Sequence, residues 1–394
     1  MTAPYPLACW LRRSLCLIAI ATTGCGDDGA TAAGDGGPKL DGGATAVDAS
    51  GPGSDATQPQ SGPAAGNPDG HCAVPAEARP EDVSSPRTVI GTGTPASCTG
   101  TAFVAAVALG GVITFDCGAD PVTITLTATA KVFNDTGPKV VIDGGGKVTL
   151  SGGGRVRILY QNTCDPAQRP TSAKCNDQET PALTLQNLTF VDGSAKGLPD
   201  TDNLGGGGAV WVRGGRLKIL NSRFFNNVCD DLGSDVGGGA LRVLDFPSSG
   251  DSSTRAVYVV SSTFGGATGS GNHCANGGAI SSIGTSYTIL NSLLTDNTAV
   301  GHGANSGEGG NGGAVYNDGN KYTLSLCGDR LERNHANEGG SAVFYVSNNK
   351  TGTFEITDSV LTHNPKGTFE TSAYPGTFII AAPNNPKVTR STIE

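Results

Sequence analysis

The carboxylates between residues 230 and 235 are the main candidates for chemistry in this chain. Asp230, Asp231 and Asp235 form its best acidic cluster, and Arg242 follows seven residues later. Clustered carboxylates suit Ca²⁺, and an arginine close to an acidic sugar proton is the base that a polysaccharide lyase needs. The alternative interpretation is that these side chains are solvated residues on the outer face of a sheet.

A second candidate is His302, which lies between two glycines. Gly301-His302-Gly303 resembles a polygalacturonase signature, and Asp230 with Asp231 could supply the paired acids of glycoside hydrolysis. The Arg-x-Lys expected after the histidine is missing, because Arg216-Leu217-Lys218 lies upstream of it. The triplet also falls in a glycine-rich loop, which weakens this hydrolase interpretation.

The elements that must position these residues are marked by a repeated unit: a small polar pair, one variable residue, then Phe or Leu. Its copies are Asn187–Phe190, Asn221–Phe224, Ser261–Phe264, Asn291–Leu294, Gly328–Leu331 and Asp358–Leu361. The apolar anchors that end the copies are 34, 40, 30, 37 and 30 residues apart. A short unit of this kind can bury its apolar face only by stacking on the next copy, so the sequence predicts a repeat protein.

A second signature, Gly-Gly-Ala before an aliphatic residue, is interleaved with the first. Its copies begin at Gly207, Gly238, Gly277 and Gly312, with a variant at Gly339. Small residues suit positions where the backbone bends closely into the next strand. A solenoid turn takes roughly 20–25 residues, so about ten extra residues per repeat are expected to project as loops.

The remaining patterns predict an all-β body. Asparagine follows the anchor by three residues at positions 227, 297, 334 and 364, where the side-chain amides can stack as a ladder. Short runs rich in β-branched residues, such as Val122–Leu126, alternate with Gly, Asn and Asp turns. The exception is Thr101–Leu109, a predicted helix that would cap the open end of the stack.

The N-terminus has the pattern of an export signal. Arg12 and Arg13 precede the apolar run Leu15–Ala21, and Thr22-Thr23-Gly24-Cys25 follows. This resembles a bacterial lipoprotein signal, residues 1–24, with Cys25 as the lipidated first residue; ordinary secretion is the alternative. Gly26 favours delivery to the outer membrane, at the cell surface or on the periplasmic face. Residues 25–70 hold few large apolar side chains and are predicted to be a disordered tether before a β domain at 71–394.

Cysteine and charge agree with export. Eight cysteines remain after Cys25, and an even number in an exported chain predicts disulfides. The expected pairs are Cys98–Cys117, Cys164–Cys175 and Cys229–Cys274. The net charge is −9 and no basic patch appears, which argues against nucleic acid as a partner and leaves the lipid as the only membrane contact.

The two signatures together resemble the repeats of the polymorphic outer membrane protein family. Gly-Gly-Ala is clean at Gly207, Gly277 and Gly312, and Phe-x-x-Asn is strict at Phe224-Phe225-Asn226-Asn227. The resemblance covers about residues 90–394 and implies a right-handed parallel β-helix of the pectate-lyase superfamily. It also implies surface or adhesin-like roles, while other members of that superfamily are polysaccharide lyases and hydrolases.

We therefore expect a lipid-anchored, non-catalytic surface module that binds a polysaccharide or another cell-surface ligand. A Ca²⁺-dependent polysaccharide lyase is the alternative, followed by a glycoside hydrolase, because fold alone does not confer activity. No cofactor is expected apart from Ca²⁺ in the lyase case. Aromatic residues that could stack on sugars, or pack in the core instead, are Trp211, Tyr258, Tyr287, Tyr316, Phe344 and Tyr345.

Overall fold

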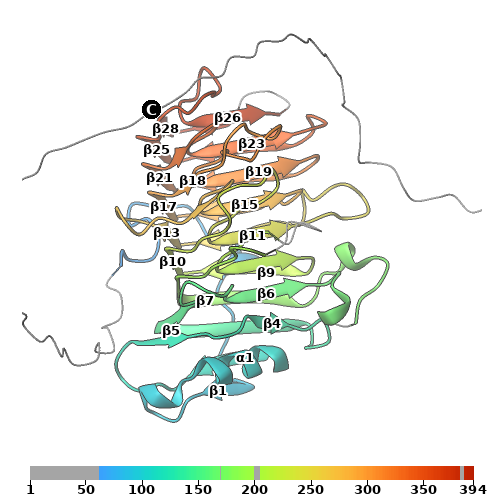
Figure 1. Cartoon of the computed structure of the whole chain (residues 1–394), viewed down its shortest axis with the longest axis vertical. Helices are drawn as coiled ribbons and strands as arrows, with labels where there is room; N and C mark the ends of the chain where they lie inside the picture. Colours follow the sequence, from blue (N-terminus) through green and yellow to red (C-terminus); the bar gives the residue numbers. More distant parts are fainter. Residues whose placement is uncertain (1–61, 169, 199–204, 382–385) are drawn as a thin grey trace, which may run out of the picture. The chain divides into compact units, whose positions relative to one another are not determined.

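The computed structural model describes residues 62–168, 170–198, 205–381 and 386–394. The expected signal peptide 1–24, the lipidation residue Cys25 and the tether up to residue 61 lie outside the described residues. The described chain is mostly β, as expected, and its named strands pair in parallel (Figure 1).

Three sheets organise the described strands. The largest contains β1 (Thr88–Ile90), β2 (Gly111–Phe115), β3 (Val122–Thr125), β5 (Lys139–Ser151), β7 (Ala182–Val191), β9 (Arg216–Leu220), β10 (Arg223–Phe225), β12 (Val257–Val260), β13 (Thr263–Gly265), β16 (Tyr287–Leu290), β17 (Leu293–Thr295), β20 (Thr323–Cys327), β21 (Arg330–Glu332), β24 (Thr353–Thr357), β25 (Val360–Thr362), β27 (Lys387–Thr389) and β28 (Thr392–Ile393). The eight-stranded sheet contains β4 (Ala130–Val132), β6 (Leu159–Asn162), β8 (Val210–Arg213), β11 (Leu241–Leu244), β15 (Ile280–Ile283), β19 (Val315–Gly319), β23 (Val343–Ser347) and β26 (Thr377–Ile380). The three-stranded sheet contains β14 (His273–Cys274), β18 (Thr298–Ala299) and β22 (His335–Ala336).

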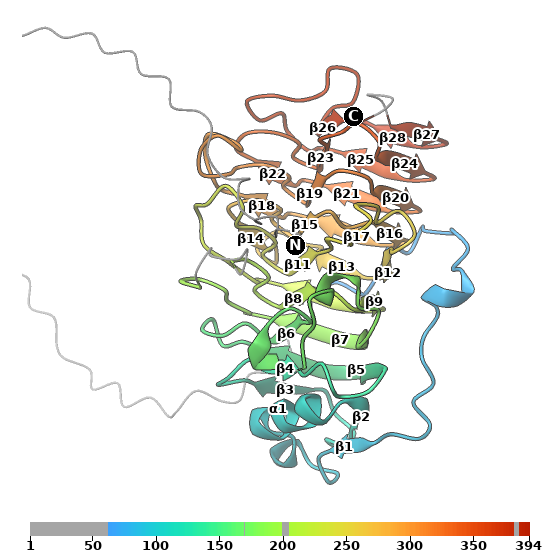
Figure 2. The same cartoon turned by 90° about the vertical axis from the view of Figure 1, so that its right-hand side faces the viewer.

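Successive repeats contribute equivalent strands to these sheets. For example, β15, β16 and β17 pair in parallel with β19, β20 and β21, the equivalent strands of the next repeat. The 17-stranded sheet has two limbs, β9-β12-β16-β20-β24-β27 and β10-β13-β17-β21-β25-β28, which meet because the long strand β7 pairs with both β9 and β10. The views in Figures 1 and 2 show these strands stacked in sequence order.

The anchors of the repeated unit form the centre of the core. Phe190, Phe224 and Phe264 stack with ring centroids 4.8 and 4.5 Å apart and with nearly parallel planes. The same row continues through three leucines, and all six side chains are fully buried: Leu294, Leu331 and Leu361. The prediction that each anchor is buried against the next copy is therefore confirmed.

The small polar pair of each unit forms the corner between the two limbs. Its first residue adopts a positive φ, from +46° at Asn221 and Ser261 to +71° at Gly328, a conformation that Gly, Asn and Asp tolerate best. The second residue is buried and links neighbouring repeats. Ser222 accepts a hydrogen bond from the Leu188 backbone N–H at 3.3 Å, and Ser262 accepts one from the Ser222 N–H at 3.2 Å.

The expected asparagine ladder is present. Side-chain amides bond from Asn227 to Asn272, Asn297, Asn334 and Asn364 in turn, at 2.9, 2.9, 3.0 and 3.1 Å. The sequence pattern missed Asn272, because inserted residues place it eight positions after Phe264 instead of three. All five side chains are buried, and their mutual hydrogen bonds remove the cost of burying amides.

A helix covers the N-terminal end of the main core, as expected. Helix α1 (Gly100–Leu109) begins after Thr99, whose hydroxyl accepts a hydrogen bond from the Ala102 N–H at 3.2 Å. Its buried residues Phe103, Ala106 and Val107 belong to the main core. Short 3-10 turns lie at Ala76–Ala78, Pro95–Ser97, Pro166–Gln168 and Cys175–Asp177.

Four disulfides join the eight cysteines of the described chain. They include the three expected pairs, Cys98–Cys117, Cys164–Cys175 and Cys229–Cys274. The fourth, Cys72–Cys327, joins residues 255 apart in sequence, and no spacing rule pointed to it.

Residues 62–82 form a strap that crosses the outer face of the 17-stranded sheet. Cys72 is linked to β20, and the Asn291 side chain both accepts from the Cys72 N–H at 2.8 Å and donates to its carbonyl at 2.9 Å. Asp69 pairs with Arg330 at 2.8 Å. Figure 2 shows the blue segment running past the stacked strands toward β1. Residues 62–70, which composition assigns to the disordered tether, therefore belong to the folded body, because their polar groups find partners at the corners of the repeats.

Candidate functional site

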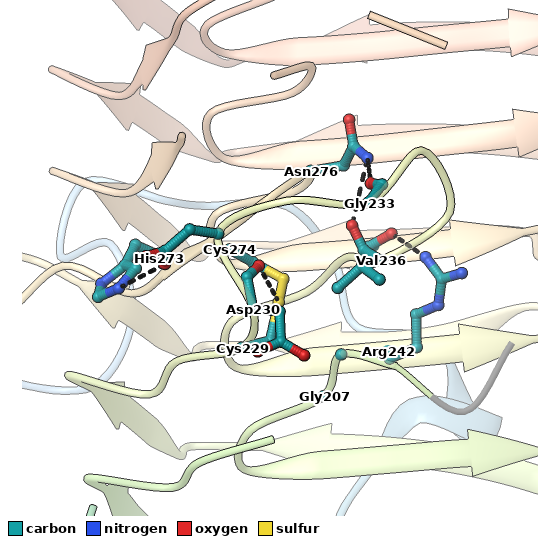
Figure 3. Close-up of a disulfide and its surroundings, with 12 residues drawn as sticks. Gly207, Cys229, Asp230, Gly233, Val236, Arg242, His273, Cys274 and Asn276 are labelled. Carbon is teal, nitrogen blue, oxygen red and sulfur yellow. Dashed lines mark hydrogen bonds and ion pairs between the residues drawn. A yellow bond between two sulfur atoms is a disulfide. The ribbon is translucent and has the colours of Figure 1, made fainter. Parts of the chain in front are cut away.

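Arg242, the expected lyase base, is buried beneath a loop. Its neighbours Leu241 and Val243 face the main core, so the alternation of strand β11 directs Arg242 to the other face of the eight-stranded sheet. The side chain has no exposed surface, and its guanidinium donates to Ser281 Oγ and to the Asp235 carbonyl, each at 2.5 Å. The expectation of a solvated Arg242 is therefore wrong: the guanidinium secures the 230–237 loop against the sheet (Figure 3).

The acidic cluster is divided between two sets of contacts. Asp230 accepts from the Gly197 N–H at 2.9 Å, and Asp231 pairs with Lys196 at 3.0 Å, beside the Cys229–Cys274 disulfide. Asp235 instead uses its carbonyl to hold Arg242. Across the described residues, the group of metal-ligand side chains close enough to share an ion is Cys72, Cys327 and Asp358, of which two form a disulfide. The three aspartates are therefore not gathered into the Ca²⁺ cluster that their sequence spacing suggested.

His302 lies on an exposed loop, apart from Asp230 and Asp231. Its Nδ1 is 3.4 Å from the Asn337 amide nitrogen, and the adjacent Gly303 N–H donates to Glu338 at 2.7 Å. These contacts order the 300–311 loop. They place no carboxylate of the predicted acid pair beside the imidazole.

One buried acidic residue on the same face of the eight-stranded sheet as Arg242 was missed: Asp318 on β19. Burial raises the pKa of Asp318 above its ordinary value, and the negative charge of Asp235 adds to the rise. The Asp318 carboxylate accepts from Asn348 at 2.8 Å and from the Tyr316 hydroxyl at 3.4 Å. Asp318 stands four residues after Ala314, as Arg213 stands four after Ala209, and this offset was the available sequence signal.

The aromatic residues considered for sugar stacking mostly pack inside the protein. Trp211 stacks on Tyr160 at 5.0 Å, and Tyr316 stacks on Phe344 at 5.0 Å. Trp211, Tyr287, Tyr316 and Tyr345 are almost completely buried. Tyr258 differs from these four, because it is only partly buried and lines an open groove.

That groove lies between the strap and the first limb of the 17-stranded sheet and has a volume of about 460 Å³. Strands β5, β7, β9 and β12 supply Lys139, Thr184, Lys218 and Tyr258, and the strap supplies Glu77 and Glu81. Thr184, Lys218 and Tyr258 are register partners on adjacent strands, so they form one row along the groove.

The Glu81 carboxylate bridges the two lysines of the groove. One oxygen lies 2.9 Å from Lys139 Nζ and the other 2.5 Å from Lys218 Nζ. Partial burial raises the pKa of Glu81, but the hydrogen bonds and charges of Lys218 and Lys139 together outweigh burial and leave the pKa below its ordinary value. The two ammonium groups therefore form a site of the size of one carboxylate, open to the groove on one side.

A second cavity, of about 590 Å³, lies near the N-terminal strands and contains the carboxylates of Asp116, Asp120 and Asp143. Asp143 is buried and already accepts hydrogen bonds from the Gly145 N–H and from the Gln186 and Asn187 side chains. Its role is to hold the bulge in β5, between Asp143 and Val148.

The helices of the described part of the chain include none long and apolar enough to cross a membrane. Comparisons with protein-family models, with curated proteins and with solved structures found no match to this chain.

Proposed function

We propose that the stacked repeats form a right-handed parallel β-helix. The support is the parallel, in-register pairing of equivalent strands in successive repeats, together with the positive-φ corners and the asparagine ladder. The right hand follows the strong preference of crossovers between parallel strands in one sheet. This is also the fold that the resemblance of the repeats implies.

We further propose that the protein is a lipid-anchored surface module of the outer membrane that binds an acidic polysaccharide without cleaving it. The observation that carries the binding role is the groove beside the strap. There Lys139 and Lys218 place two cations around one carboxylate-sized position, which the Glu81 carboxylate occupies in the structure, and Thr184 and the partly buried ring of Tyr258 lie in the same row as Lys218. Cations, hydroxyls and an aromatic face are the groups that hold an anionic sugar chain.

The binding role is tested with the purified mature chain and alginate or pectate oligomers, measured by calorimetry, with dextran as a neutral control. Binding of the acidic oligomers should weaken at least tenfold in the Lys139→Ala/Lys218→Ala double variant. The matched control is Lys387→Ala, which removes a lysine from the same limb outside the groove. Equal affinity of the double variant and the wild type would contradict the groove as the binding site.

The anchor is tested by fractionating cells that express the wild type or Cys25→Ala. Lipid on Cys25 predicts that the wild type is recovered with the outer membrane and that the variant is released. A variant that stays with the membrane would contradict the anchor, because the lipid on Cys25 is the only membrane contact expected from the sequence.

The lyase alternative has weaker support. Arg242 is enclosed and donates to Ser281 and Asp235, while Asp230 and Asp231 bond to residues 196–197. Formation of unsaturated products from pectate, alginate or chondroitin with Ca²⁺, lost in Arg242→Ala but retained in the control Arg223→Ala, would replace the binding proposal by this one.

A further inference from the structure

We propose that the strap is an internal competitor for the groove, and that the Cys72–Cys327 disulfide keeps it in place. This inference rests on the proposed function, since it assigns a regulation to the same binding site. The strap approaches the lysines from residues that lie far from them in sequence: Glu81 is 58 residues from Lys139 and 137 from Lys218.

The first argument is chemical mimicry. The Glu81 carboxylate holds the position between the two ammonium groups that a carboxylate of the ligand would need. Two lysines cannot each donate fully to Glu81 and to an external carboxylate at the same position. An acidic ligand must therefore displace Glu81, and its apparent affinity is reduced by the fraction of molecules in which Glu81 is bound.

The second argument is that the strap is attached to the sheet covalently at Cys72 and by non-covalent contacts elsewhere. Around Cys72 it has a disulfide and two hydrogen bonds to the Asn291 side chain. Toward Glu81 its contacts are non-covalent: Ala78 and Val74 pack with Leu220, Val260 and Leu290. Tyr258 donates to Glu77 at 3.3 Å, Lys218 donates to the Arg79 carbonyl at 3.1 Å, and the Gln186 side chain bonds both the N–H and the carbonyl of Glu81. The Glu81 end can thus leave the lysines while Cys72 remains attached, and it returns at a high local concentration.

The disulfide therefore sets the strength of the competition. Reduction by a dithiol transfers two electrons and two protons to the pair, which gives two cysteine thiols and the oxidised, cyclic disulfide of the reductant. The strap then keeps its non-covalent contacts and its chain connection to β1 but loses the link to β20, so the bound fraction of Glu81 falls and the groove opens to external carboxylates. Lys139, Lys218 and Tyr258 themselves are not changed by this step.

The test measures binding of alginate oligomers to the full mature chain and four variants. Glu81→Gln should bind about three- to tenfold more tightly than the wild type, because it removes two charge pairs of the strap, one with the exposed Lys139 and one with the partly buried Lys218. Its matched control is Glu355→Gln, which loses a carboxylate paired with Lys387 on the same limb outside the strap. Cys72→Ser/Cys327→Ser should also bind more tightly, whereas Cys164→Ser/Cys175→Ser should not.

Hydrogen exchange of residues 74–82 is measured on the same proteins, and it should accelerate in Cys72→Ser/Cys327→Ser but not in the other cysteine variant. If the wild type binds and Glu81→Gln binds equally well, the competition is wrong while the binding site stands. If no variant binds any acidic oligomer, both the proposed function and this inference are wrong. Because Glu81→Gln leaves the disulfide intact, a folding defect of the cysteine variant cannot decide the outcome.

Discussion

The outer faces of the two large sheets are covered in different ways. On the eight-stranded sheet, the loops of the repeats themselves fold back, so that Trp211, Arg242 and Tyr316 are buried although they point away from the main core. On the 17-stranded sheet, the apolar row Leu220, Val260 and Leu290 is covered by the strap, a segment from outside the repeats. The comparison teaches that the inserted loops mainly complete one face, whereas the other face is completed by a segment from outside the repeats and keeps an open groove.

Trp211→Ala should reduce stability the most, because it leaves a cavity on the loop-covered outer face of the eight-stranded sheet. Truncating a fully buried tryptophan of this size costs about 3–5 kcal/mol of unfolding free energy, and Trp211 also has the Arg157 guanidinium 5.8 Å from its ring centre. Denaturant unfolding measures the loss. A cost below about 1 kcal/mol would mean that this face is not packed as a core.

Cys72→Ser/Cys327→Ser should come next, with a loss of about 2–4 kcal/mol, since this disulfide closes a very long loop. Thermal unfolding under non-reducing conditions compares this loss with that of Cys164→Ser/Cys175→Ser. The disulfide removed there joins cysteines only 11 positions apart, so its loss should cost less. Equal losses in the two variants would contradict the view that the strap depends on its disulfide more than other segments do.

The two faces should respond to pH in opposite directions. The pKa of Asp318 is raised in the folded protein, so the folded state binds more protons than the unfolded chain and stability falls as pH rises from the ordinary carboxyl pKa through the raised one. The pKa of Glu81 is lowered, so its contribution is present above the ordinary pKa and is lost as pH falls through the lowered one. In a plot of unfolding free energy against pH, Asp318→Asn should remove only the fall in stability as pH rises, and Glu81→Gln only the loss of stability as pH falls. The assignment would be refuted if either substitution changed both parts of the plot.

Glu355→Gln should have the smallest effect. Glu355 lies 3.5 Å from Lys387 and both side chains are exposed, so the change in unfolding free energy should stay within about 0.5 kcal/mol. Chemical denaturation checks this value. A larger loss would mean that lone surface pairs on this limb stabilise the sheet, which would weaken the use of Glu355→Gln as a control for the strap.

The repeat could be predicted from the sequence because its residues act on near neighbours. Phe224 and its equivalents had to be buried, and Asn227 had to find an amide in the next repeat; both follow from residue type and spacing. Asn272 escaped the pattern only because a loop shifted it along the chain. The disulfides Cys98–Cys117, Cys164–Cys175 and Cys229–Cys274 could also be predicted, because each joins cysteines that lie closer together in the sequence than Cys72 and Cys327 do.

The candidate site could not be predicted in this way. The sequence showed that Arg242 alternates with core residues on its strand, but it did not show that a loop covers this side chain. Asp230 and Asp235 make separate contacts although they are only five positions apart. Glu81 gave no signal at all, since its two lysine partners lie on strands of two different repeats.

The sequence by itself determined the repeated unit, its buried anchors and its asparagine ladder, because a short-period pattern specifies which side chains must stack on equivalent ones. Only the tertiary structure decided that residues 62–82 cross the sheet, that Cys72 meets Cys327, and that Glu81 sits between Lys139 and Lys218. Those contacts join segments more than fifty residues apart in sequence, where no local pattern constrains which residue meets which.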